Sequence, residues 1–137
     1  MSSNFIEYFE NELHTQPKKV DNCNMCHREI VVLVGSGYDI DFIRNTLWKL
    51  CQRYESKLGL EYRFNDSTKI FAIIKRDKQK ICMIRVYIRK ANKISLVGYR
   101  PDMIVAYGSF SAKQCGVICD FIQHVNKPYL EVRFLNR

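Results

Sequence analysis

Two cysteines and a histidine near the N-terminus form the clearest candidate for metal chemistry. Cys23, Cys26 and His27 lie in a polar stretch, and the C-x-x-C spacing lets two thiolates reach one zinc ion. A tetrahedral site needs further ligands, and His27 adjoins Cys26, so it could serve only awkwardly. The alternative is that these cysteines are ordinary reduced thiols. Beyond a zinc ion held by these three residues, the sequence predicts no cofactor.

The remaining cysteines are expected in the core. Cys51 and Cys82 fall on apolar faces of predicted elements, and Cys115 and Cys119 share a helical stripe with Ile118. Six cysteines without a secretion signal favour reduced thiols over a disulfide framework. No Gly-x-Ser-x-Gly or His-Glu-x-x-His signature is present, so the sequence leans away from an enzyme without excluding one.

A glycine-containing turn is the candidate for phosphate binding. The apolar run 30–34 ends at Gly35, Ser36 and Gly37, and a helix follows, which is the arrangement by which a helix N-terminus cradles phosphate. The third glycine of the dinucleotide fingerprint and the lysine of a P-loop are missing. Asp39 and Asp41 would also repel an anion at this helix N-terminus. A tight turn that requires small residues is the competing interpretation.

The positive charge of the chain is concentrated in one segment. The 137 residues carry 22 basic and 14 acidic groups, and residues 75–100 hold nine of the basic groups with Asp77 as their one acid. Such a segment is typical of a surface that meets nucleic-acid phosphates. Tyr62, Phe64 and Tyr99 lie in or near it and could stack on unpaired bases. The predicted nucleic-acid-binding residues are Lys75, Arg76, Lys78, Lys80, Arg85, Tyr87, Arg89, Lys90, Lys93 and Arg100.

Two other interpretations of the basic segment remain. Its lysines could protect an exposed strand edge from aggregation, or its charge could bind an acidic protein.

The hydrophobic pattern predicts an α/β fold, with α+β as the alternative. We expect a single-domain mixed β-sheet with two main helices packed on it and a short N-terminal helix. Residues 1–28 would form that acidic helix and a cysteine-containing connector, and residues 29–137 the α/β domain. In the strand 81–88, even-numbered residues should face the core and odd-numbered residues a partner. The predicted main helices span 40–58 and 111–124, and the predicted strands span 30–34, 62–64, 68–74, 81–88, 94–97, 103–106 and 129–135.

Two short motifs carry a resemblance to a known family. Residues 31–37 (Val-Val-Leu-Val-Gly-Ser-Gly) and 98–105 (Gly-Tyr-Arg-Pro-Asp-Met-Ile-Val) resemble the ATPase core of viral and phage large terminases, the DNA-packaging proteins. In that family a phosphate loop is followed by a strand ending in an Asp-Glu pair that holds magnesium. Here the strand ends at Ala106, Tyr107, Gly108 and Ser109, and the phosphate-loop lysine is absent. The resemblance therefore implies a degenerate P-loop ATPase core without its catalytic groups.

The favoured function is that of a non-catalytic, nucleic-acid-associated protein of a virus or phage, which binds the phosphate backbone through basic strands. One alternative is a protein-interaction or assembly module, in which the acidic N-terminal helix meets the basic strands of another copy. A second is a degenerate nucleotide-binding or nuclease-like enzyme. With no signal peptide and no membrane-spanning apolar run, we expect an intracellular location, in the cytoplasm or the nucleus.

Overall fold

The computed structural model describes residues 5–15, 25–35, 40–77, 80–91, 99, 101–125 and 131–135. Its helices and strands follow one another in the order predicted for a mixed sheet with helices packed on it, which confirms the α/β class. The predicted strand at 94–97 lies outside the described residues. The elements are α1 (Phe5–His14), β1 (Met25–Val34), α2 (Ile40–Leu58), β2 (Leu60–Asn65), β3 (Ile70–Asp77), β4 (Lys80–Lys90), β5 (Met103–Tyr107), α3 (Ala112–Val125) and β6 (Glu131–Leu135).

The described strands form one six-stranded sheet in the order β2-β3-β4-β1-β5-β6. β1 runs parallel to both of its neighbours, β4 and β5, whereas β2, β3 and β4 form an antiparallel meander. The turn between β2 and β3 is held by the side-chain oxygen of Asn65, which accepts hydrogen bonds from the amides of Ser67 and Thr68. Lys69 closes this turn with a positive φ of 55°.

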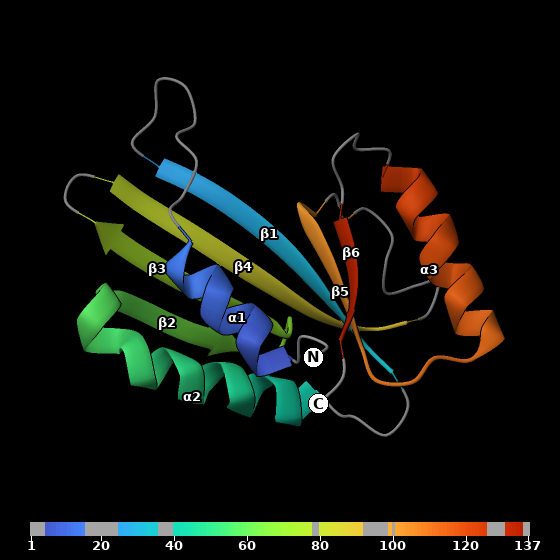
Figure 1. Ribbon diagram of the computed structural model, residues 1–137, viewed down its shortest axis with the longest axis horizontal. Coiled ribbons are helices and arrows are strands. Elements are labelled where there is room, and N and C mark those ends of the chain that lie inside the picture. The colour runs from blue at the N-terminus through green and yellow to red at the C-terminus, as the bar shows by residue number, and fades with distance from the viewer. Residues whose placement is uncertain are drawn as a thin grey trace.

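Helices cover the two faces of the sheet unequally. Ile30 and Val32 of β1 pack into the core beneath α1 and α2, while Val31 and Leu33 pack with Phe121 of α3 on the other face. Successive residues of a strand point to opposite faces, so α1 and α2 lie on one side and α3 on the other. Figure 1 shows α1 and α2 beside the β2–β4 half of the sheet and α3 at the β5–β6 end.

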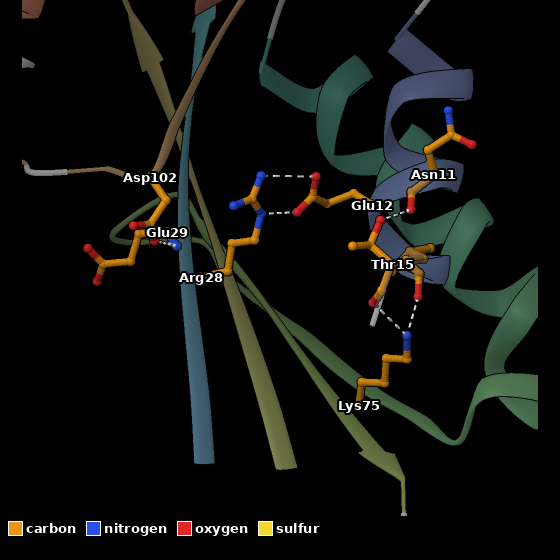
Figure 2. A network of polar contacts seen from close by, with 8 residues as sticks. Asn11, Glu12, Thr15, Arg28, Glu29, Lys75 and Asp102 are labelled. Atoms are coloured by element: carbon orange, nitrogen blue, oxygen red, sulfur yellow. Dashed lines mark hydrogen bonds and ion pairs between the residues drawn. The ribbon is translucent and has the colours of Figure 1, made fainter. Parts of the chain in front are cut away.

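The N-terminal helix belongs to this core. Phe5, Phe9 and Leu13 of α1 are buried, and Glu12 forms an ion pair with Arg28 of β1. Lys75 of β3 donates hydrogen bonds from Nζ to the main-chain oxygens of Leu13 at 2.7 Å and Thr15 at 3.2 Å. Figure 2 shows how the contacts of Arg28 and Lys75 tie the C-terminal end of α1 to two strands.

The first strand begins earlier than the sequence suggests. β1 starts at Met25, within the stretch assigned to a polar connector, and pairs with β4 along its whole length. Its polar first half is anchored to α1 and to the residue that precedes β5. Arg28 meets Glu12 of α1, and the Glu29 amide donates to the Asp102 carboxylate at 2.8 Å (Figure 2).

Within the described residues, no helix combines the length and the apolar character needed to cross a membrane.

Candidate nucleic-acid interface

One half of the sheet leaves a face without a described helix. Along β4, Cys82, Ile84, Val86 and Ile88 are buried on the α1–α2 side. The residues between them are less buried, and Arg85 is exposed, so the predicted alternation is confirmed. We call the other side of β2–β4 the open face. It comprises Glu61, Arg63, Ile70, Ala72, Ile74, Arg76, Ile81, Met83 and Arg85.

Two arginines lie in one row across the open face. In the strand register, Arg63 of β2 pairs with Ala72 of β3, and Ala72 pairs with Arg85 of β4. Adjacent strands lie about 4.8 Å apart, so the two arginine backbones are separated by about 10 Å. The residue between the two arginines in this row, Ala72, has a small side chain. Both arginines are exposed, and within the described part of the chain Arg63 has no ion-pair partner.

Acidic side chains partly balance this surface. Arg76 Nε donates to Glu61 at 3.1 Å, so the charge of this arginine is already balanced by a carboxylate of the neighbouring strand β2. Glu29 of β1 stands level with Arg85 and accepts a hydrogen bond from the Tyr87 hydroxyl at 3.1 Å. Burial and the nearby Glu29 carboxylate raise the pKa of Tyr87. The charge available to an external anion therefore rests mainly on Arg63 and Arg85.

Arg89 is used inside the protein. Its guanidinium lies over the rings of Tyr87 and Tyr99, 5.7 and 5.1 Å from their centroids. It donates to the Tyr99 hydroxyl at 2.6 and 3.0 Å and to the main-chain oxygens of Lys69 and Ile88. Arg89 and Tyr87 thus hold Tyr99 against the sheet, and their polar groups face neighbouring residues.

The other predicted contacts separate in space. Lys75 is buried on the α1 side with its ammonium on helix carbonyls, so it is not part of the open face. Lys90 is exposed at the end of β4, one residue beyond Arg89 and hence on the opposite side. Three predicted contacts, Lys78, Lys93 and Arg100, and the side chain of Lys80 lie outside the described residues.

Sequence reasoning missed Arg63, because it lies outside the basic segment. The signal was present in β2, where Leu60, Tyr62 and Phe64 alternate with Glu61, Arg63 and Asn65. The apolar series packs towards the core and α2, so the polar series must face the opposite side.

Two of the predicted zinc ligands lie on opposite faces of the sheet. Cys26 is buried in the core on the α1–α2 side, whereas His27, the next residue of β1, is exposed on the other face. These two side chains therefore do not meet at one ion, and Cys23 lies outside the described residues. Cys82 is the register partner of Cys26. Burial raises the pKa of the Cys82 thiol. Among the described residues, no group of three His, Cys, Asp or Glu side chains could hold a metal.

Close packing surrounds Gly35, the described residue of the phosphate-loop candidate. A Cβ at Gly35 would overlap the main-chain oxygen of Ser109, and the Gly35 amide donates to the main-chain oxygen of Tyr107 at 2.8 Å. This contact joins the carboxyl ends of β1 and β5, where open α/β sheets commonly bind ligands. Tyr107 is buried there, 4.8 Å from Phe5 in ring-centroid distance. Gly35 thus has a packing reason to be glycine, and Ser36 and Gly37 lie outside the described residues.

The expectation that the cysteines of α3 are buried in the core is wrong. Cys115 and Cys119 are exposed rather than buried. The buried stripe of α3 consists of Ile118, Phe121 and Val125, which face the sheet. The two cysteines lie beside this stripe and face outward.

Comparison with known proteins supports the fold. No protein-family model matches the chain, and no curated protein matches it in sequence. Among solved structures, the large terminase of a thermophilic bacteriophage superimposes with a TM-score of 0.59 over 96% of this chain at 10% identity. The ATPase domain of the large terminase of a Thermus phage gives a TM-score of 0.52 over 80% of this chain at 8% identity.

These likenesses confirm the predicted resemblance in fold to large terminases. The chain spans 29% of the first of these structures and 48% of the Thermus phage domain. At such low identity, similarity of fold does not carry activity with it.

Proposed function

We propose that this protein is a non-catalytic, nucleic-acid-associated protein of a virus or phage that binds phosphates on its open face. The row Arg63–Ala72–Arg85 carries the proposal, because it presents two exposed guanidinium groups on either side of a small residue. Guanidinium groups bind phosphate oxygens in a bidentate manner.

The close packing at the carboxyl ends of β1 and β5 favours a non-catalytic role. Gly35 and Ser109 are in main-chain contact there, and the aromatic rings of Phe5 and Tyr107 pack beside them. The sequence also supplies neither a P-loop lysine nor an Asp-Glu pair after β5. The open face therefore remains the better candidate for contact with nucleic acid.

The salt dependence of binding tests this proposal. Affinity for a short labelled DNA or RNA single strand would be measured by fluorescence anisotropy across a salt series. Each phosphate contact contributes about 0.7 to the slope of log K against log salt for a single strand. The double variant Arg63→Ala/Arg85→Ala should bind more weakly, with a slope reduced by about 1.4.

A matched control removes the same charge from another surface. Lys49 and Lys57 are exposed on α2, so Lys49→Ala/Lys57→Ala has the same net charge as the test variant. This control should retain most of the slope of the wild-type protein. An equal loss in both double variants would refute a role for the open face, because only the overall charge would then matter.

A second candidate function, docking of an acidic protein, is favoured by the apolar centre of the same face. Ile74 and Met83 are register partners there and are only partly buried. The acidic helix of another copy is a poor occupant. In α1, Glu10 accepts a hydrogen bond from Tyr54 at 2.8 Å, and Glu12 pairs with Arg28. Light scattering of wild type and Ile74→Asp would test the self-association form of this candidate, and a monomer in both cases would exclude self-association and leave a different acidic protein as the occupant.

A further inference from the structure

A second surface, on the other side of β2, combines one exposed and two partly buried aromatic rings with cations. Trp48 of α2 lies edge-on to Tyr62 of β2, with ring centroids 4.7 Å apart. Arg44, one turn before Trp48, places its guanidinium 5.6 Å from the Phe64 ring centroid. Lys69 Nζ lies 5.9 Å from the same centroid. We call Arg44, Trp48, Tyr62, Phe64 and Lys69 the aromatic platform.

The platform rests on a rigid base. Phe71 of β3 is fully buried, and its ring centroid lies 6.2 Å from those of Trp48 and Phe64 and 6.5 Å from that of Tyr62. The Tyr62 hydroxyl donates to Glu55 at 2.7 Å, and this bond raises the pKa of Tyr62 to about 12. The rings are therefore held in place while one of them, Trp48, remains 39% exposed.

Cations and one acid border the platform. Lys69 pairs with Asp66 at 2.9 Å, and this contact lowers the pKa of Asp66, with a smaller contribution from Arg44. Asp66 thus pairs with Lys69 and lies near a second cation, Arg44, although it is exposed to water. A phosphate would compete with this carboxylate for both of them.

We infer that the aromatic platform stacks an unpaired nucleic-acid base and that Arg44 and Lys69 bind the adjoining phosphate. Every base has an aromatic face, and stacking on protein rings is the usual means of binding single strands. In a duplex the bases are already stacked and paired, so single-stranded nucleic acid is the expected ligand. This inference rests on the proposed function and specifies the form of nucleic acid that the protein binds.

The platform and the open face share one strand. Arg63 points to the open face, whereas Tyr62 and Phe64, its two neighbours, point to the platform. β2 lies at one end of the strand order. A single strand that crosses the β2 edge can therefore place phosphates against Arg63 and a base against the platform.

The fluorescence of Trp48 provides a direct test, because it is the one tryptophan in the chain. Oligothymidylate of about 12 nucleotides, a length within the usual range of single-strand sites, would be added to the wild-type protein. Stacking at the platform should quench Trp48 emission with the same midpoint as the anisotropy change of the labelled strand. A duplex of equal length should leave Trp48 emission nearly unchanged.

Substitutions then separate the platform from general charge. Arg44→Gln should weaken oligothymidylate binding severalfold, whereas Lys49→Gln, the same change of charge on the same helix, should have little effect. Phe64→Leu should weaken binding by about tenfold through lost stacking. Asp66→Asn should strengthen binding, because it releases Lys69 from its carboxylate partner. Arg44 and Asp66 are surface residues, so their variants remain informative even if Phe64→Leu fails to fold.

The outcomes distinguish this inference from the proposed function. If oligothymidylate binds without quenching Trp48, and Arg44→Gln behaves like Lys49→Gln, the platform is refuted while binding on the open face stands. Equal quenching by duplex would also refute base stacking. If neither oligothymidylate nor duplex binds at all, both proposals are wrong.

Discussion

Lys75 Nζ lies 2.7 Å from the main-chain oxygen of Leu13, so the first residue of the basic segment binds the end of α1. The last carbonyls of a helix lack partners within the helix and carry the negative end of its dipole. Lys75 supplies both a hydrogen-bond donor and a positive charge at this end. Lys75 therefore stabilises the fold and is not available to bind an external phosphate.

Replacing Lys75 with methionine should destabilise the protein by about 1–3 kcal/mol, because buried carbonyls would lose a charged donor. Urea unfolding monitored by circular dichroism would measure the change. Lys57→Met provides the control, because Lys57 is exposed on α2. Equal midpoints for Lys75→Met and wild type would contradict the capping role.

Two glycines should respond to alanine in opposite directions. Gly35→Ala should destabilise by about 2 kcal/mol, because the new Cβ would overlap the main chain at Ser109. A Cβ at Gly116 of α3 would meet no atom within 4 Å. Gly116→Ala should therefore stabilise by about 1 kcal/mol through helix propensity. Thermal melts of both variants would test this, and a stable Gly35→Ala protein would contradict the close contact.

The thiols should fall into two reactivity classes. Cys115 and Cys119 are exposed, whereas Cys26, Cys51 and Cys82 are buried. In a Cys23→Ser background, a disulfide reagent such as DTNB should modify two thiols quickly and three only after unfolding. Rapid modification of all five would contradict the burial of Cys26, Cys51 and Cys82.

Stability should fall in alkaline solution. Burial, with a smaller contribution from Glu55, raises the pKa of Cys51 from 9.0 to about 12. The unfolded thiol loses its proton first, so the folded state binds more protons between these values and stability decreases as pH rises through them. Cys51→Ala should show a shallower decline over this range in urea unfolding at several pH values. Parallel profiles for both proteins would contradict this assignment.

Local patterns predicted much of the fold. The alternation in β4 correctly indicated which of its side chains face the core, and the helix predicted over 40–58 is α2. Long-range contacts were not predictable. Lys75 is buried only because α1, some 60 residues away in sequence, packs against β3. The cysteines of α3 shared an apolar stripe in the sequence, but the orientation of α3 on the sheet turned them outward.

The candidate site also depended on tertiary structure. Arg85 and Arg63 join one row only because β3 inserts Ala72 between β2 and β4. The basic segment drew attention to Arg85, but nothing in its composition identified Arg63 as a partner. Conversely, Arg89 lies within the segment and is used to hold Tyr99.

Chemical-shift mapping by NMR tests the central claim most directly. Titration of the labelled protein with single-stranded oligonucleotide should perturb amide signals around Arg63, Ala72 and Arg85. The signals of α3, on the far part of the sheet, should remain unchanged. Perturbations confined to α3, or none at concentrations well above the dissociation constant measured by anisotropy, would contradict binding on the open face.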